Sequence, residues 1–330
     1  MKKVDLNNHR GVHWFNKMGW SPFAFQLDTW SAYAAGRSGL VNAPTGSGKT
    51  YSLAVPILLE GLNAKEKKIQ AIWITPIRAL AKEIKLATDR AAEGLGSSWK
   101  IGIRTGDTRA AEKIKQKDKP PQFLITTPES LHQLISNKGY EEYFSDLKCI
   151  VLDEWHELMG SKRGVQAELA LSRLKTIAHD MKIWGISATI GNMDQSMEVL
   201  LGDRCHDQNH SIIRADIQKK IEIESVYPDE LELLPWSGHI GIHLLKKAID
   251  IVQRNSSTLI FTNTRSFAEI WYQKMLDTAP ELSGQIAMHH GSISQELRHW
   301  VEEQLHEGKL KAVICTSSLD LGVDFRPVDA

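Results

Sequence analysis

The chain has 330 residues, enough for about two domains of ordinary size. Its 40 basic and 40 acidic residues balance, so no overall positive charge favours nucleic acid, and any such binding must come from a local surface. The N-terminus lacks the apolar run of a signal peptide, and no stretch of about 18 apolar residues occurs, which predicts a cytoplasmic protein without a membrane partner. Three scattered cysteines agree with a reducing compartment, and Cys149 and Cys315 are expected in the core.

Residues 14–26 are rich in aromatic side chains and are interrupted by Gly19 and Pro22. One interpretation is that this segment only covers the N-terminal side of the core. The other is that Gln26 presents its amide to the edge of a base, with an aromatic ring stacked nearby. The position of Gln26 just upstream of a phosphate-binding sequence strengthens the second interpretation.

That phosphate-binding sequence is Ala-Pro-Thr-Gly-Ser-Gly-Lys-Thr at residues 43–50, between a short apolar run and a helical pattern. In a strand, loop and helix arrangement, backbone N–H groups and the positive end of the helix dipole face an anion. Lys49 reaches the outer phosphates, and the Thr50 hydroxyl can hold Mg²⁺. The first consensus glycine is replaced by alanine, but Gly46 and Gly48 still supply the backbone freedom that the loop needs. The sequence therefore predicts a nucleoside triphosphate site.

From residue 39 to about residue 201, short apolar runs alternate with helical stretches. The runs are residues 40–41, 71–74, 101–103, 123–125, 149–152 and 183–186, and the clearest helical stretches are residues 51–60, 78–91 and 165–177. This alternation predicts a parallel sheet covered by helices on both faces. Ligands of such sheets bind beyond the carboxyl ends of the strands, so functional residues are expected just after each run.

Two such positions carry hydroxyl groups and the start of a helix. Pro76 and Arg78 follow the second run, and Thr127 and Pro128 follow the fourth. Hydroxyls and helix N-termini bind nucleic-acid phosphates without reading sequence. The alternative is that the prolines and threonines only begin and cap helices, which we expect in either case. Four lysines between residues 113 and 119 indicate a solvated loop rather than a binding groove.

The fifth run is followed by Asp-Glu-Trp-His at residues 153–156. Asp153 is expected to hold Mg²⁺ together with Thr50, and Glu154 to orient and polarise the attacking water. The two carboxylates are adjacent at a strand end, where the alternation of side chains breaks, so both can face the site. Paired with the phosphate loop, this motif predicts nucleotide hydrolysis.

Three polar residues are candidates for linking hydrolysis to movement. His156 is placed to sense the nucleotide, and Ser187 and Thr189 follow the sixth apolar run. Their hydroxyls are expected to bond to the carboxylate and the histidine. The alternative is that they only cap the next helix.

A polar stretch at residues 202–211 predicts a linker, with a first domain at residues 1–205 and a second at 206–330. The second domain is expected to repeat the alternation. Its strands are expected at residues 221–226, 258–261, 286–288 and 312–315, and its helices at 240–253, 266–276 and 294–306. Consecutive histidines at 289 and 290 have no third ligand at suitable spacing, so no metal site is predicted there. No phosphate loop recurs, which makes the second domain a partner to the first site.

With these motifs in this order, the chain resembles superfamily 2 helicases along nearly its whole length. The phosphate loop, the Asp-Glu-x-His sequence and Ser-Ala-Thr resemble motifs of the first RecA-like domain, and residues 262–265 and 316–324 resemble the fourth and fifth motifs of the second. The sequence Asp-Glu-Trp-His-Glu-Leu, with Thr-Ser-Ser-Leu-Asp-Leu-Gly-Val-Asp-Phe from residue 316, is similar to the large-helicase-related (Lhr) group, in particular the bacterial ligase-associated DExH-box DNA helicases.

The resemblance implies two RecA-like α/β domains with parallel sheets covered on both faces, the second one truncated. It implies an ATP- and Mg²⁺-dependent helicase that moves 3′ to 5′ on single-stranded DNA, or on a duplex containing DNA or RNA, in DNA repair, with an ATP-dependent DNA ligase and a nuclease as partners. It assigns hydrolysis to Lys49, Asp153 and Glu154, nucleotide binding to Gln26, Thr45, Gly46, Ser47, Gly48, Lys49, Thr50, Gly322 and Asp324, and metal binding to Thr50 and Asp153. It assigns nucleic-acid contacts to Pro76, Arg78, Gly106, Thr127, Asn263, Arg265, Thr316 and Ser317, and coupling to His156, Ser187 and Thr189.

The chain stops at Ala330, before the glutamine-and-arginine motif that completes the second domain in this family. We therefore expect it to bind ATP and Mg²⁺ but to hydrolyse ATP slowly, with its second sheet ending on an uncovered strand at residues 312–316. The alternatives are a non-catalytic core that binds ATP and nucleic acid, an RNA helicase, or a phosphate-loop enzyme acting on a small molecule. The last is disfavoured because the second domain has no phosphate loop of its own.

Overall fold

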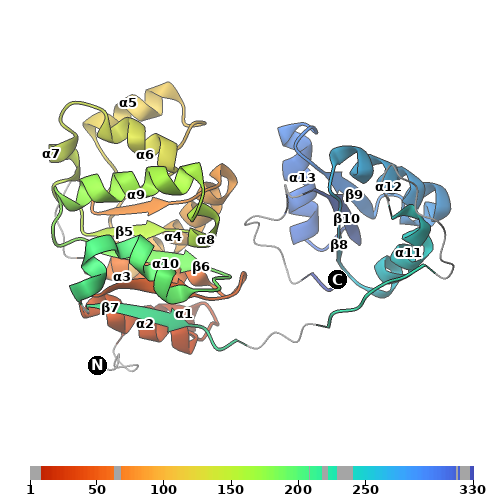
Figure 1. Cartoon of the computed structure of the whole chain (residues 1–330), viewed down its shortest axis with the longest axis horizontal. Helices are drawn as coiled ribbons and strands as arrows, with labels where there is room; N and C mark the ends of the chain where they lie inside the picture. Colours follow the sequence, from red (N-terminus) through yellow and green to blue (C-terminus); the bar gives the residue numbers. More distant parts are fainter. Residues whose placement is uncertain are drawn as a thin grey trace. The chain divides into compact units, whose positions relative to one another are not determined.

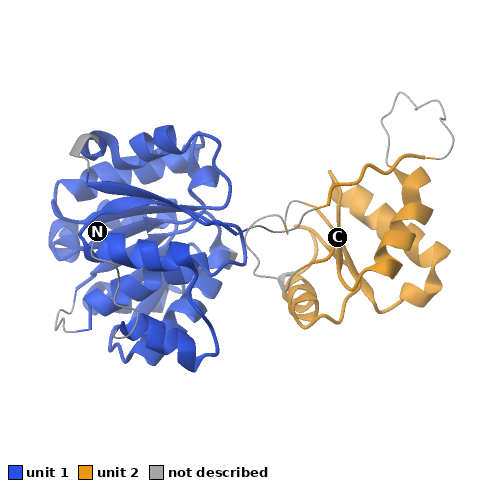
Figure 2. Cartoon of the chain, turned by 90° about the horizontal axis from the view of Figure 1, so that it is seen from below, with its two compact units in different colours: residues 1–218 blue, residues 219–330 orange. Residues whose placement is uncertain are grey.

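The computed structural model describes residues 9–62, 68–207, 209–217, 222–228, 241–316, 319 and 328–330. The chain divides into two compact units, Met1–Gln218 and Lys219–Ala330 (Figure 2). Each is built around a parallel sheet with helices packed on it (Figure 1). Two RecA-like α/β units with parallel sheets are the fold that the sequence predicts.

The first unit contains a seven-stranded sheet in the order β3-β4-β2-β5-β6-β1-β7, and every neighbouring pair is parallel. Its strands are β1 (Ser38–Asn42), β2 (Ala71–Ile74), β3 (Ile101–Arg104), β4 (Phe123–Thr126), β5 (Cys149–Leu152), β6 (Lys182–Ser187) and β7 (His210–Arg214). The six apolar runs of the sequence are β1 to β6, so that prediction is confirmed. Because β6 lies between β1 and β5, the segments that follow β1 and β5 leave the sheet near one another.

Consecutive residues along these strands enter two different cores. Ile72 and Ile150 pack in one core, whereas their neighbours Trp73 and Val151 pack in the other. Side chains alternate across a strand, so a strand with both faces buried must be apolar at nearly every position. This is why the runs show no polar alternation.

Helices cover both faces of this sheet (Figure 1). One face is covered by α1 (Arg10–Lys17), α2 (Ala24–Ala34), α3 (Lys49–Glu60) and α4 (Arg78–Leu95), and the other by α6 (Pro128–Ile135), α7 (Tyr140–Phe144), α8 (Trp155–Leu158), α9 (Lys162–Lys175) and α10 (Met193–Leu201). The remaining helix, α5 (Ala110–Asp118), carries three of the four lysines that were predicted to lie in a loop, so that prediction is wrong.

The predicted linker at residues 202–211 is also wrong, because this stretch belongs to the first unit. It forms a 3₁₀ helix, η1 (Gly202–Asp207), and the start of β7, which pairs with β1 over five residues. The first unit consequently extends past the predicted boundary at residue 205. The stretch reads as polar because β7 has neighbours on one side only and is partly exposed.

The second unit has a three-stranded parallel sheet in the order β8-β10-β9 with an apolar core on each face. Its elements are η2 (Ile242–Leu244), α11 (Leu245–Arg254), β8 (Thr258–Phe261), α12 (Arg265–Thr278), η3 (Pro280–Leu282), β9 (Ile286–His289), α13 (Gln295–His306) and β10 (Ala312–Cys315). The strand predicted at 221–226 does not form at the described residues 222–226. The expectation that residues 312–316 form an uncovered edge is wrong, because β10 is central and pairs with both β8 and β9.

Two smaller expectations concern burial and membrane contact. Cys149 and Cys315 are buried free cysteines inside the two sheets, as predicted. Among the residues that the structure describes, no helix has both the length and the apolar character needed to cross a bilayer.

Candidate nucleotide and nucleic-acid sites

The phosphate loop connects β1 to α3 and takes its shape from two glycines. Gly46 and Gly48 have φ of 76° and 72°, a left-handed conformation that favours glycine. A Cβ on Gly48 would also lie 3.0 Å from Nε2 of Gln26. The buried Ser47 hydroxyl donates to the Pro44 carbonyl at 2.6 Å, which closes the loop. The exposed Thr45 lies within this turn, and the half-buried Thr50 follows it in the first turn of α3, whose amino end can bind an anion.

An ion pair joins this loop to the sequence after β5. Nζ of Lys49 lies 3.1 Å from Oε1 of Glu154, and the two side chains are only 10% and 13% exposed. The structure thus brings together the two halves of the predicted hydrolysis site, which are 105 residues apart in the sequence.

Glu154 reaches the site through an unusual backbone conformation. Its φ of 44° makes it the one non-glycine residue of the described chain with positive φ, at the turn between β5 and α8. Such a conformation costs on the order of 1–3 kcal/mol in a non-glycine residue and is found at functional sites. This conformation interrupts the alternation of side chains along the strand, so the consecutive carboxylates of Asp153 and Glu154 both lie near Lys49.

Asp153 is buried and held at both carboxylate oxygens. Oδ2 accepts a hydrogen bond from Nε1 of Trp73 at 3.2 Å, and Oδ1 accepts one from the Glu154 N–H at 3.0 Å. Burial, with the charge of Glu154, raises the pKa of Asp153 to about 6, against the opposing effect of Lys49. A carboxylate retains further lone pairs for a cation, and burying its charge favours a positive partner. Asp153, with Thr50, therefore fits the predicted Mg²⁺ site.

The predicted coupling residues also meet. His156 Nδ1 lies 2.8 Å from the Ser187 hydroxyl and 3.5 Å from Oε2 of Glu154. The Ser187 hydroxyl also contacts the carbonyl of Thr189 at 3.2 Å, whereas the Thr189 side chain is exposed. Asn42, the last residue of β1, donates to the Ala188 carbonyl at 3.1 Å. The segment after β6 is therefore connected to both β1 and the histidine beside the carboxylates.

Gln26 lies against the phosphate loop. Its side chain is 1% exposed, and its amide donates to the Gly48 carbonyl at 3.0 Å and accepts from the Phe23 N–H at 2.9 Å. Several aromatic residues of this segment pack edge to face in the core, for example Trp14 against Tyr51, whereas Phe23 and Phe25 are stacked. The segment thus covers the core, as the first interpretation holds, and it places Gln26 at the loop. The contact to adenine stays a prediction.

The loops after β2, β3 and β4 lie side by side because these strands are neighbours in the sheet. We call residues 75–78, 105–108 and 127–130 the carboxyl-edge loops. Arg78 pairs with Asp107 at 2.8 Å, and a Cβ on Gly106 would meet the Arg78 guanidinium. Thr127 is buried, and its hydroxyl donates to Ser130, so its side chain is turned inward.

In the second unit, the predicted contacts among the described residues follow the carboxyl ends of β8 and β10. Arg265 donates to the Ser292 hydroxyl at 2.7 Å, and the neighbouring Asn263 is exposed. The half-buried Thr316 donates its N–H to the His289 carbonyl. Ser317, Gly322 and Asp324 lie outside the described residues.

Sequence reasoning missed three residues that make polar contacts at these sites. They are Trp73 at Asp153, Asp107 at Arg78, and Arg163 at Pro76 and Glu129. Trp73 reads as a core residue of an apolar run, and the other two depend on which strands are neighbours. No signal within the local sequence identifies them.

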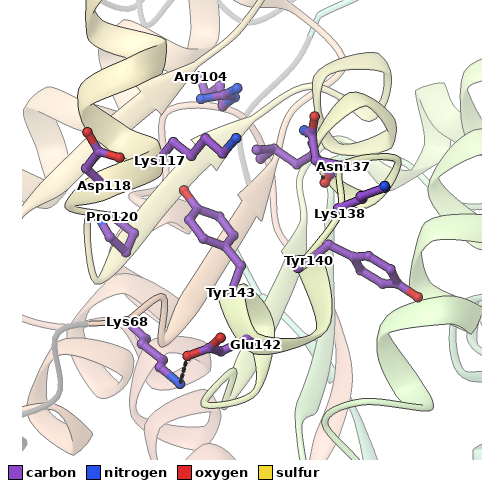
Figure 3. Close-up of a pocket in the computed structure, with 12 residues that line it drawn as sticks. Lys68, Arg104, Lys117, Asp118, Pro120, Asn137, Lys138, Tyr140, Glu142 and Tyr143 are labelled. Carbon is purple, nitrogen blue, oxygen red and sulfur yellow. Dashed lines mark hydrogen bonds and ion pairs between the residues drawn. The ribbon is translucent and has the colours of Figure 1, made fainter.

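A cavity of about 390 Å³ lies elsewhere on the first unit, beside α5, α6 and α7 (Figure 3). Lys68, Arg104, Lys117 and Tyr143 are among its lining residues, and none of the predicted site residues lines it. Lys68 precedes β2, at the amino side of the sheet, and pairs with Glu142 across the cavity rim. This cavity is therefore separate from the nucleotide site.

Comparison with known proteins agrees with this geometry. The family described as DEAD/DEAH box helicase matches residues 23–196, and that described as helicase conserved C-terminal domain matches residues 242–330. The chain is 33% identical over 312 residues to the ATP-dependent helicase Lhr-Core of Methanothermobacter thermautotrophicus, covering 89% of this chain and 36% of that protein. It is 30% identical to the Lhr helicase/uracil glycosylase of Escherichia coli, covering 96% and 24%.

Among solved structures, the chain is similar to the helicase Lhr of Mycobacterium smegmatis bound to single-stranded DNA and AMP-PNP. The TM-score is 0.77 at 30% identity, covering 98% of this chain and 43% of that chain. The chain spans less than half the length of each of these three relatives.

Proposed function

This chain belongs to the DEAD/DEAH box helicase family and is Lhr-like, and on that premise we propose that it is a motor core that hydrolyses ATP to move along single-stranded DNA. The observation that carries the proposal is the ion pair between Lys49 of the phosphate loop and Glu154 after β5. It joins a phosphate-binding cation and a candidate general base in one largely buried site beside Asp153. These three groups correspond to the phosphate-binding cation, the metal ligand and the water-positioning carboxylate that phosphoryl transfer to water uses.

In the proposed mechanism, the triphosphate is bound by the N–H groups of the phosphate loop and by Lys49. Thr50 and Asp153 would hold Mg²⁺, which neutralises charge on the phosphate oxygens when it is bound. Lys49 leaves Glu154 to bind phosphate, which frees the carboxylate to orient a water and to accept its proton. His156 contacts both Glu154 and Ser187, so the release of Glu154 from Lys49 would alter the contact between His156 and Ser187.

Nucleic acid is proposed to lie on the carboxyl-edge loops and on the corresponding loops of the second unit. Arg78 and Arg265 supply the charge, and the remaining groups are hydroxyls, backbone N–H groups and helix starts. Such groups bind the phosphate backbone and carry little sequence information, so weak sequence preference is expected. Single-stranded DNA is proposed as the substrate because the Lhr structure of M. smegmatis is described with it bound.

The finer assignments are part of the same proposal. By resemblance to ligase-associated helicases, the chain would act 3′ to 5′ in DNA repair, with a DNA ligase and a nuclease as partners, in the cytoplasm. The adenine contact of Gln26 belongs here too, since its amide adjoins the phosphate loop.

The test is the steady-state ATPase rate of the purified chain with no nucleic acid, with single-stranded DNA and with single-stranded RNA. We expect stimulation by DNA, and loss of both ATP binding and turnover in Lys49→Ala. Stimulation by RNA alone would favour an RNA helicase. ATP and DNA binding without turnover would favour a non-catalytic core, and turnover independent of any nucleic acid would favour a small-molecule enzyme.

A further inference from the structure

Arg163, in the first turn of α9, makes three hydrogen bonds that none of the predicted roles accounts for. Its Nε and Nη2 donate to Oε1 and Oε2 of Glu129 at 2.5 and 3.2 Å, a bidentate pair. Its Nη1 donates to the carbonyl of Pro76. One guanidinium therefore joins the loop after β2 to the first turn of α6, which follows β4.

Two observations indicate that the pair between Arg163 and Glu129 is stable: Glu129 is ionised, and the start of the helix that carries Arg163 is fixed. Burial by itself raises the pKa of Glu129, but the hydrogen bonds, with Arg163 foremost, outweigh it and lower that pKa, so the carboxylate remains ionised near neutral pH. The start of α9 is fixed because the Ser161 hydroxyl accepts from the Gly164 N–H and donates to the Leu158 carbonyl. A Cβ on Gly164 would lie 1.9 Å from that same carbonyl oxygen, so α9 begins in close contact with the end of α8.

The position of the bridge suggests its role. Pro76 and Glu129 belong to two of the carboxyl-edge loops, and α8 directly follows Asp153 and Glu154. An arginine fork has the planar geometry that can hold a carboxylate and a carbonyl at fixed positions, which a lysine ammonium does not reproduce. Arg163 thus contacts two of the loops proposed to bind nucleic acid from α9, the helix that comes after α8 in the chain.

We propose that Arg163 is a positioning residue that, with Glu129, holds the carboxyl-edge loops in the arrangement that binds the nucleic-acid backbone. This inference rests on the proposed function, because it requires that these loops bind nucleic acid. Arg163 acts through Pro76 and Glu129 and does not itself contact the strand.

The experiment measures the dissociation constant for single-stranded DNA by fluorescence anisotropy on the full chain, with two unrelated sequences and at fixed salt. Arg163→Gln is expected to weaken binding about tenfold, the order of one lost charge-assisted pair. Arg163→Lys should bind DNA nearly as weakly as Arg163→Gln, because lysine keeps the positive charge but cannot form the bidentate pair with Glu129. The affinity for ATP should change less than about twofold in both. The matched control is Arg173→Gln, on the same helix, which removes a 3.5 Å pair with Glu141 and should leave both affinities unchanged.

The decisive variant is Glu129→Gln. It removes a negative charge from a surface that binds a polyanion, so electrostatics alone predict tighter binding. Positioning predicts weaker binding, and predicts that the double variant with Arg163→Gln is no weaker than the single ones. Thermal unfolding of every variant separates loss of positioning from loss of fold, since an exposed pair of this kind contributes only about 0–1 kcal/mol to stability.

Full rescue by lysine, or tighter binding in Glu129→Gln, would mean that Arg163 acts as a simple charge on the strand, and the inference would be wrong. Unchanged DNA affinity in Arg163→Gln would overturn the inference and leave the proposed function standing. A parent chain that binds no single-stranded DNA would overturn both.

Discussion

Replacing Glu154 with glutamine is expected to separate ATP binding from ATP hydrolysis, because this carboxylate is the proposed general base and also pairs with the lysine of the phosphate loop. The change keeps the shape of the side chain and removes its charge. Glu154 pairs with Lys49 at 3.1 Å, so in the proposed mechanism ATP competes with this carboxylate for the lysine. Glu154→Gln removes that competitor together with the candidate general base.

The size of the effect on binding follows from the pair's geometry. Two unit charges 3.1 Å apart attract by about 5 kcal/mol at an effective dielectric constant of about 20. Desolvation of two largely buried side chains offsets most of this, leaving a net pair energy of about 1 kcal/mol. ATP affinity should therefore rise about fivefold in Glu154→Gln. Hydrolysis should fall about 10²- to 10⁴-fold, the usual contribution of general base catalysis.

The assay combines a nucleotide titration, followed by a fluorescent ATP analogue, with the steady-state ATPase rate at saturating single-stranded DNA. The matched control is Glu157→Gln, since Glu157 lies on α8, contacts Nε2 of His156 at 3.4 Å and has no contact with Lys49. Hydrolysis within a few-fold of the parent would remove Glu154 from the role of base. Weaker ATP binding would show that the ion pair does not compete with nucleotide.

Three further predictions address the strand contacts and the metal site. Arg78→Ala or Arg265→Ala should weaken binding of unrelated DNA sequences equally and reduce the slope of log K against log salt by about one unit, and a loss limited to one sequence would contradict a backbone contact. In the presence of a metal chelator, Asp153→Asn should have a free energy of unfolding up to about 3 kcal/mol above that of the parent at pH 8 but not near pH 4. The pKa of Asp153 is raised to about 6 in the folded parent, so the protonated carboxyl stabilises the fold at pH values below the pKa of the unfolded chain, and this stability is lost as the pH rises through 6. A difference in unfolding free energy that did not change with pH would contradict this reasoning. Trp73→Phe should weaken Mg²⁺-dependent nucleotide binding, whereas Trp184→Phe, which removes an indole hydrogen bond to a backbone carbonyl, should not.

The strands and the pairing of the two hydrolysis motifs were predictable from the sequence. Runs such as residues 149–152 are apolar at each position because both faces of the sheet are covered, and a lysine and two carboxylates after parallel strands are expected at one end of the sheet. The sequence did not reveal β7, because one side of an edge strand faces solvent and its composition resembles a linker. Nor did it reveal Trp73 or Arg163, whose partners depend on the strand order β4-β2-β5.

The parallel pairing of β7 with β1 has a mechanical consequence. The chain leaves the first unit after β7, so tension carried along the polypeptide from the second unit enters the first through this strand. Five residues of β7, from His210 to Arg214, are in register with Ser38 to Asn42, and Ala215 adds a hydrogen bond to the Asn42 carbonyl. A pull along the strand loads these bonds together in shear, rather than one after another as in peeling. The load reaches β1, the strand that ends at the phosphate loop, so under the proposed function a force on the second unit would be felt at the nucleotide site through this one pair of strands.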